Sequence, residues 1–145
     1  MDISADLTAP CPPGDLLAWV DDLGRYPRWL TIVTSATPVP AVEGDAGPAW
    51  LVDLRGRLGP LARSKRLRMV RTEASPSRAV FERREADGRS HARWVLEASV
   101  TPADEGSRLE MHLHYGGSLW GPVLERMLGD EIENSRPRLL ACLAG

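Results

Sequence analysis

The segment SLWGPVLERMLGDEIENSRPRLLACLAG (residues 118–145) closes the chain and decides its fold. Its apolar side chains recur every three or four residues, which is the spacing that places them on one face of a helix. Pro122 suits the first turn of such a helix, and Pro137 should kink the helix without ending it. The sequence therefore predicts one long helix with a single apolar stripe, formed by Leu124, Met127, Leu128, Ile132, Ser135 and Leu139.

A half-apolar helix must bury its stripe against another layer of structure, and the preceding segments indicate a sheet. Apolar and polar residues alternate along most of them, as in half-buried strands. Pro38 and Pro40 make the first segment after residue 30 an edge or bulged strand. The turns between the segments are short, which favours antiparallel pairing. Strands are predicted at residues 2–9, 32–42, 49–57, 62–73, 78–86, 91–100 and 107–116, with a tight turn at Asp87–Gly88.

Two short helices should follow the first strand. The stretch PCPPGD ends that strand, and Asp15 or Gly14 can cap a helix that Gly24 ends. RYPRWL (residues 25–30) should add one more helical turn. The predicted order is one strand, two short helices, six strands and the long terminal helix, which is an α+β arrangement.

Composition places the chain among ordinary globular proteins. Its 145 residues suit a single domain spanning 1–145, with 43% hydrophobic residues and a net charge of −2. We find no secretory signal and no apolar run long enough to span a membrane. We therefore expect a cytoplasmic protein in which Cys11 and Cys142 are free thiols. We also expect a monomer or a weak dimer.

The order of elements resembles that of the polyketide cyclase/dehydrase and START-related (SRPBCC) superfamily. LLAWVDDLGRYPRW follows the first strand, and YGGSLWGPVLERML and EIENSRPRLL occupy the end of the chain. The resemblance covers essentially the whole chain. It implies the helix-grip fold, a seven-stranded antiparallel sheet wrapped around the long C-terminal helix. It also implies that the chain binds a hydrophobic molecule, because members bind lipids, polyketides, quinones or hormones, and some are aromatases or cyclases.

His112 and His114, in LEMHLHYGG (residues 109–117), raise the question of a metal site. They lie on the same side of a strand, opposite Met111 and Leu113. If the apolar side faces the helix, both histidines face outward. A zinc site requires further ligands, and His91 is the one other histidine, so we expect no metal and no cofactor. The same parity predicts a solvated outer face that carries Asp53, Arg55, Arg66, Arg68, Glu82, Arg84, Arg93, Glu97, Arg108, Glu110, His112 and His114.

The basic run RSKRLRMVR (residues 63–71) raises the alternative of nucleic-acid binding. Acidic residues on neighbouring strands should neutralise it, and no aromatic residue shares its basic face, as single-strand binding requires. We therefore expect no nucleic-acid partner. On the opposite side of the same strand, Lys65 and Arg71 face inward if Leu67 and Met69 do.

The inner face supplies the candidate binding site for a hydrophobic small molecule, either polyketide-like or lipid-like. Proton-transfer groups are few on this face, where Tyr115 is a candidate catalytic residue. Tyr26, in the pair of short helices, is a second candidate because it could reach the mouth of a cavity. Two functions stay open: a polyketide cyclase or dehydrase, and a non-catalytic carrier of a lipid or quinone. The candidate lining residues are Trp29, Trp50, Leu67, Met69, Phe81, Trp94, Met111, Leu113, Tyr115, Leu124, Met127 and Leu128.

Overall fold

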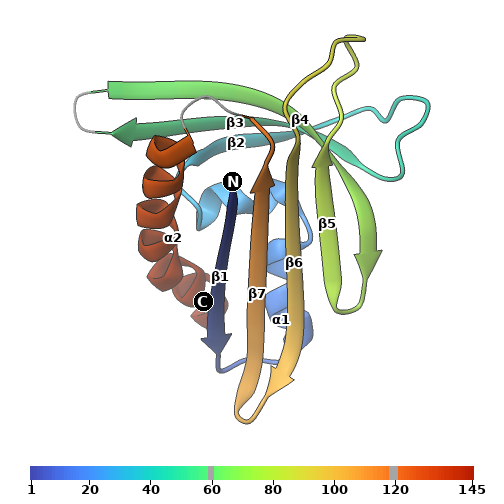
Figure 1. The fold of residues 1–145 in the computed structure, drawn as a ribbon. Helices are drawn as coiled ribbons and strands as arrows, with labels where there is room; N and C mark the ends of the chain where they lie inside the picture. Colours follow the sequence, from blue (N-terminus) through green and yellow to red (C-terminus); the bar gives the residue numbers. More distant parts are fainter. Residues whose placement is uncertain (59–60, 118–120) are drawn as a thin grey trace.

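A computed structural model describes residues 1–58, 61–117 and 121–145. The segments with strand or helix patterns form seven strands, two α-helices and one 3₁₀ helix (Figure 1). In chain order they are β1 (Asp2–Ala9), α1 (Pro13–Val20), η1 (Leu23–Arg28), β2 (Val33–Val39), β3 (Ala49–Leu58), β4 (Leu61–Ser75), β5 (Arg78–Arg83), β6 (Trp94–Ala103), β7 (Gly106–Tyr115) and α2 (Gly121–Ala144).

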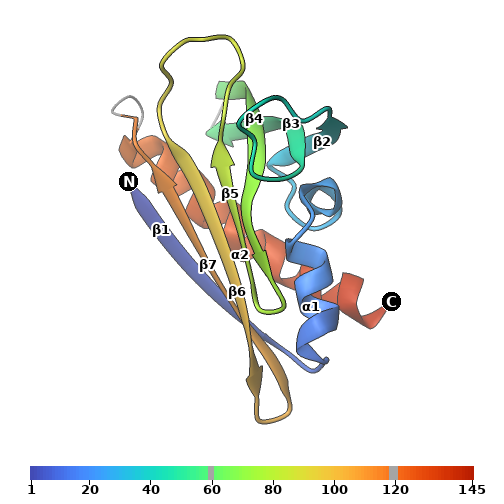
Figure 2. The same cartoon turned by 90° about the vertical axis from the view of Figure 1, so that its right-hand side faces the viewer.

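The seven strands form one antiparallel sheet in the order β1-β7-β6-β5-β4-β3-β2. The sheet is bent: β3 and β4 run across the top of Figure 1, whereas β1, β7 and β6 run from top to bottom. The turned view shows α1 and α2 on the same side of the sheet (Figure 2). The predicted α+β helix-grip architecture is confirmed.

Several predicted boundaries are wrong. The turn predicted at Asp87–Gly88 is part of a longer loop, residues 84–93, between β5 and β6. Strand pairing between β4 and β5 stops at Arg68. Its backbone N–H donates to the Glu85 carboxylate at 3.1 Å and not to a backbone carbonyl of β5. Strand β6, in contrast, continues past its predicted end at residue 100 to Ala103, which pairs with Gly106 of β7.

The end of the first helix also differs from the prediction, because it comes at Val20 and not at Gly24. Asp22 caps η1 by accepting a hydrogen bond from the Gly24 N–H at 2.8 Å, which starts a separate helix there. In the C-terminal helix Pro137 lies inside the continuous α2, as predicted. The predicted start of that helix, residues 118–120, lies outside the described residues.

The inner face of the sheet forms the core together with the helices. Phe81 at the centre of β5 is fully buried, with Tyr26 and Trp50 packed edge-on against it at ring-centroid distances of 6.3 and 5.8 Å. Trp29 packs beside Tyr26 at 4.8 Å. This aromatic cluster fills the space between η1 and the strongly bent part of the sheet.

Arg68 departs from the predicted solvated outer face. Its side chain is only 8% exposed and forms an ion pair with Asp45 at 2.7 Å. Its guanidinium also donates to the carbonyls of Pro40 and Arg84, at 3.2 and 3.0 Å. The connection between β2 and β3 carries Pro40 and Asp45 over this part of the outer face, and parity within a strand cannot predict such a covering loop.

Acidic residues pair with arginines on and beside the basic run, as the sequence predicts. Arg66 pairs with Asp53 of β3 at 2.8 Å, and Arg78 of β5 pairs with Glu97 of β6 at 3.0 Å. Arg71 lies on the inner side, where its guanidinium donates to the carbonyl of Asp21 at 2.9 Å and caps the end of α1. Lys65 is exposed.

Candidate ligand-binding site

Inner-face side chains of neighbouring strands meet in rows, because directly paired residues share a face. One row comprises Phe81, Leu96, Leu113 and Ile3, on β5, β6, β7 and β1. The next row comprises Ala79, Ala98, Met111 and Ala5, and the third comprises Val100, Leu109 and Leu7. These three rows are entirely apolar.

A cavity of about 100 Å³ lies between these rows and α2. Its walls are almost wholly apolar, and the polar residues Asp6, Glu131, Ser135 and Arg136 also border it, where β1 approaches the helix. Its apolar lining residues are Ile3, Ala5, Leu7, Trp29, Leu30, Leu96, Leu109, Met111, Leu113, Leu128, Ile132 and Leu139.

Hydrogen bonds hold α2 against the side of this cavity. Arg136 donates to the backbone carbonyl of Asp6 on β1. The Thr31 hydroxyl donates to Glu131 at 2.8 Å and accepts from Arg138 at 2.8 Å. These bonds are partly exposed to solvent, so water can replace them at low cost when the helix moves.

One further row, formed by Trp50, Met69, Arg83, Trp94 and Tyr115, follows the apolar rows toward the end of the sheet where β6 begins and β7 ends. Trp50 pairs with Met69, Met69 with Arg83, and Trp94 with Tyr115. Arg83 directly follows Glu82, the partner of Val95, so the same register places it beside Trp94. Unlike the other rows, this row carries N–H and O–H donors.

The comparisons with known proteins agree with this geometry. The family model described as "Polyketide cyclase / dehydrase and lipid transport" matches residues 1–140. The chain belongs to this family. A search among curated proteins finds no match.

Solved structures with the same fold have low sequence identity to this protein. A START superfamily protein from Mycobacterium smegmatis is 14% identical, with a TM-score of 0.72 over 99% of this chain and 97% of that one. A protein from Thermus thermophilus is 22% identical, with a TM-score of 0.69 over 99% and 94% of the two chains. At these identities the likeness establishes the fold alone.

Four of the predicted lining residues border the cavity between the sheet and α2: Trp29, Met111, Leu113 and Leu128. Six others, Trp50, Leu67, Met69, Phe81, Trp94 and Tyr115, are buried in the core cluster, and Leu124 and Met127 pack half-buried against it. Met127 lies directly over Gly56 of β3, where any larger side chain would collide with its sulfur. Burial on the inner face was thus predictable, whereas the location of the empty space was not.

Sequence reasoning missed several lining residues that its own patterns contained. Ile3, Ala5 and Leu7 alternate along β1, and Ile132 and Leu139 belong to the predicted helix stripe. Alternation along a strand does not give the order of strands in the sheet, so it cannot show which strand lies beside the helix. The structure makes β1 an edge strand beside α2, which places its apolar side at the cavity.

Tyr26 does not present its hydroxyl to the cavity. The side chain is fully buried between α1 and η1, and the hydroxyl donates to the carbonyl of Val20 at 2.8 Å. Burial raises the pKa of this phenol far above its usual range. Tyr115 differs, because it lies on the inner face with its hydroxyl against Gly117.

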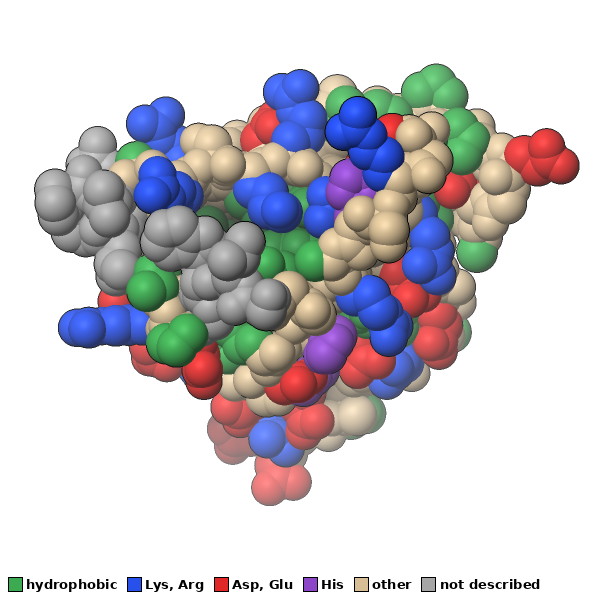
Figure 3. Space-filling model, turned by 45° about the horizontal axis from the view of Figure 1, so that its top comes forward, with side chains coloured by type: hydrophobic (Ala, Val, Ile, Leu, Met, Phe, Trp, Pro, Cys, Tyr) green, Lys and Arg blue, Asp and Glu red, His purple; other side chains and the backbone are tan. Residues whose placement is uncertain are grey.

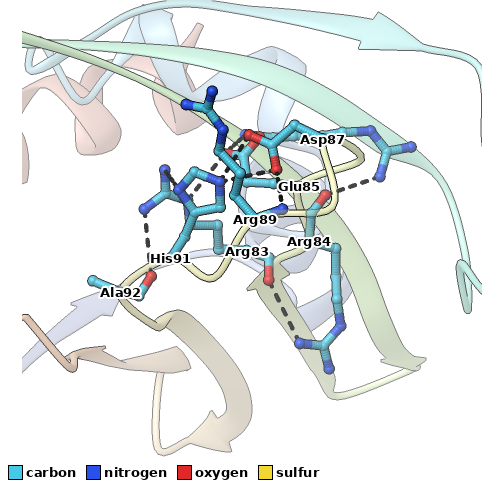
Figure 4. A network of polar contacts seen from close by, with 8 residues as sticks. Arg83, Arg84, Glu85, Asp87, Arg89, His91 and Ala92 are labelled. Carbon is cyan, nitrogen blue, oxygen red and sulfur yellow. Dashed lines mark hydrogen bonds and ion pairs between the residues drawn. The ribbon is translucent and has the colours of Figure 1, made fainter.

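Arg83 was not predicted, although it lies two residues after the inward-facing Phe81. Its side chain is 8% exposed and pairs with Glu85 at 2.9 Å (Figure 4). Its NH2 group lies 3.3 Å from Nδ1 of His91, and an arginine can only donate. His91 therefore donates through Nε2 to Asp87 at 2.9 Å. The Arg89 backbone N–H and His91 hold the pKa of Asp87 below its usual value.

His112 and His114 lie on the outer face, as predicted. Both contact the Asp2 carboxylate, His112 through Nε2 at 2.8 Å and His114 through Nδ1 at 3.0 Å. These hydrogen bonds lower the pKa of Asp2. Among the described residues no group of three or more His, Cys, Asp or Glu side chains could hold a metal ion. None of the described helices is long and apolar enough to cross a membrane.

Proposed function

We propose that this protein binds a hydrophobic small molecule, lipid-like or polyketide-like, in the cavity between α2 and strands β1, β6 and β7. The observation that carries the proposal is the almost wholly apolar wall of this cavity. Water gains few hydrogen bonds in such a space, whereas apolar surface of a ligand gains by entering it. Membership of a family described by polyketide cyclisation and lipid transport supports the same class of ligand.

The cavity must enlarge to hold such a ligand. Its volume is about 100 Å³, and sites for small molecules usually measure roughly 300–1,000 Å³. The partly exposed bonds of Arg136 and Thr31 help to hold α2 against β1 and the residues before β2. We infer that α2 moves outward when the ligand enters, because the sheet behind the cavity is continuous.

Catalysis by a cyclase or dehydrase is the second candidate, and the inward position of Tyr115 favours it. Proton transfer requires an acid or base within hydrogen-bond reach of the substrate. The described apolar rows carry none, and the ionisable groups Asp6, Glu131 and Arg136 lie at the border of the cavity. We therefore place binding before catalysis.

A cavity-filling variant tests the proposal. Ala5 of β1 lines the cavity, and Ala5→Phe should occupy much of its volume. Binding would be followed by fluorescence of 1-anilinonaphthalene-8-sulfonate and by its displacement with decanoate. We expect Ala5→Phe to weaken both affinities by at least about tenfold, which corresponds to about 1.4 kcal/mol.

Thr8→Phe is the matched control, because Thr8 lies on the exposed outer side of the same strand. It should bind both probes like the unaltered protein. Unchanged binding by Ala5→Phe, in a variant whose circular dichroism shows a folded protein, would contradict the proposed site. Ala5→Leu provides a smaller filling if Ala5→Phe does not fold.

A further inference from the structure

Trp94 carries a polar group that the rest of the described structure leaves unused. Its side chain is buried, with 5% of the residue exposed. Its indole Nε1 is the one buried side-chain nitrogen or oxygen, among the described residues, that has no hydrogen-bond partner. Buried donors in native proteins are almost always paired, so an unpaired one calls for an explanation.

The position of Trp94 relates this donor to the cavity. Trp94 pairs with Tyr115, and the next inward pair along the same two strands is Leu96 with Leu113. Leu96 and Leu113 both line the cavity. Two residues along a strand span about 6–7 Å, so the indole lies one row beyond the apolar wall.

The nearest charged donor of the same row, Arg83, is already bound within the protein. Arg83 donates to Glu85 and to the carbonyl of Ala92, at 2.9 and 3.4 Å. The Tyr115 ring packs against the Trp94 ring at a centroid distance of 4.8 Å, and its hydroxyl lies against Gly117. Arg83 is thus bound within the protein, whereas the Trp94 indole N–H is a buried donor that a ligand can engage without breaking a bond within the protein.

The surface is hollowed at the corresponding end of the molecule. Figure 3 brings forward the end at which β7 finishes, and it shows hydrophobic side chains at the bottom of a hollow. Lys and Arg side chains border this hollow in the same view. A ligand that enters here would have its apolar part inside and its polar end in the row of Trp94.

We propose that Trp94 determines ligand specificity by donating its indole N–H to a carbonyl or carboxylate oxygen at one end of the hydrophobic ligand. This inference rests on the proposed function and narrows the ligand class to hydrophobic molecules with a terminal oxygen acceptor. A pure hydrocarbon would leave the N–H unpaired and would gain only from the apolar wall. Discrimination is strong at such sites because a buried polar group without a partner is costly.

Three probes with a common ring system test this inference: naphthalene, 2-acetonaphthone and 2-naphthoate. They offer no acceptor, a ketone and a carboxylate, respectively. Trp94→Phe removes the N–H and keeps an aromatic ring. We expect it to weaken binding of at least one of the two oxygen-bearing probes about tenfold while it changes naphthalene binding less than twofold.

Trp19→Phe is the matched control for replacing an indole by a phenyl ring. Trp19 lies away from the cavity, stacked beneath Arg25 and Arg28 at 5.3 and 5.2 Å, and its substitution should leave all three affinities unchanged. Nitrogen-15 spectra of the unaltered protein provide a second measurement. The Trp94 indole proton should shift downfield with the acceptor probe and not with naphthalene.

The outcomes separate the two proposals. Loss restricted to 2-naphthoate identifies a carboxylate, and loss restricted to 2-acetonaphthone identifies a ketone. Each supports the role of Trp94. Equal effects of Trp94→Phe on all three probes, or an unshifted indole signal with a bound acceptor probe, would overturn that role while ligand binding stands. Failure of the unaltered protein to bind any of the three would overturn the proposed function itself.

Discussion

Arg68 and Asp45 form an ion pair that solvent hardly reaches, with side chains 8% and 5% exposed. The guanidinium holds the pKa of Asp45 below its usual value, and the backbone N–H of Val42 adds to the effect. Two charges in such a place are favourable only as a pair, because each has lost its hydration. Removing one of them should therefore cost more than an exposed ion pair is worth.

We predict that Asp45→Asn lowers the free energy of unfolding by about 3 kcal/mol at pH 7. The difference from the unaltered protein should depend on pH. Because the folded pKa of Asp45 lies below the unfolded value of about 3.9, its contribution is complete above that value. It is lost as the pH falls through the folded pKa, where the unaltered protein also loses the charge.

Urea unfolding between pH 7 and pH 2 measures this difference, provided that the protein remains folded at the lower pH. Asp53→Asn is the matched control, since Asp53 pairs with an arginine that is 68% exposed. It should cost clearly less than Asp45→Asn, because exposed ion pairs contribute little to stability. A cost for Asp45→Asn no larger than that of the control would show that the buried pair contributes nothing special.

The outer-face histidines lead to the opposite expectation. His112 and His114 are more than one-third exposed, and the Asp2 that joins them is exposed too. Replacing both histidines with Gln should change the free energy of unfolding by less than about 1 kcal/mol at neutral pH, as is usual for surface positions. Thermal and urea unfolding would check this, and a loss above about 2 kcal/mol would mean that these side chains contribute more than a surface contact.

At the scale of elements, the backbone at the start of β7 closely approaches the end of β1 at Gly106. A side chain at Gly106 would collide with the carbonyl of Ala9 and with the Cα of Pro10. Both are backbone atoms, which cannot turn aside as a flexible side chain can. The end of β1 would have to move away from β7, along which it pairs from Asp2 to Ala9.

We therefore predict that Gly106→Ala lowers the free energy of unfolding by about 1–3 kcal/mol. Gly14→Ala is the control, because beyond the chain neighbours and the backbone of α1 itself no atom lies within 4 Å of the added methyl group. It should be neutral or stabilising, by up to about 1 kcal/mol. Chemical unfolding of the two variants compares them directly, and equal stabilities would refute the proposed clash.

The strand and helix patterns predicted the elements well where one side of a segment faces the core and the other faces solvent along its whole length. They failed where a side chain or a loop intervened. At Arg68 the loop before β3 converts an outward position into a buried one. At Glu85 a carboxylate takes the place of a strand carbonyl and ends β5. Both effects come from residues distant in sequence, and local alternation contains no information about them.

The whole molecule behaves, in our proposal, as a sheet that holds its shape and a helix that moves. A ligand that binds the folded state alone should stabilise it by about 2.7 kcal/mol when its free concentration is 100 times the dissociation constant. We predict that decanoate raises the melting temperature of the unaltered protein in proportion to the logarithm of its concentration. Ala5→Phe should lose this rise, and an equal rise in both proteins would indicate binding outside the cavity.

The sequence by itself determined the order of the elements, the inner and outer sides of most strands, and the apolar stripe of the terminal helix. These follow from local periodicity, since each strand residue alternates in direction and each helical turn repeats. Only the tertiary structure decided that β1 lies at the edge beside α2, that the remaining space is about 100 Å³, and that Trp94 is left with an unpaired N–H. The physical reason is that a cavity and an unpaired donor are what remains after all side chains have packed, and packing depends on volumes contributed by distant segments.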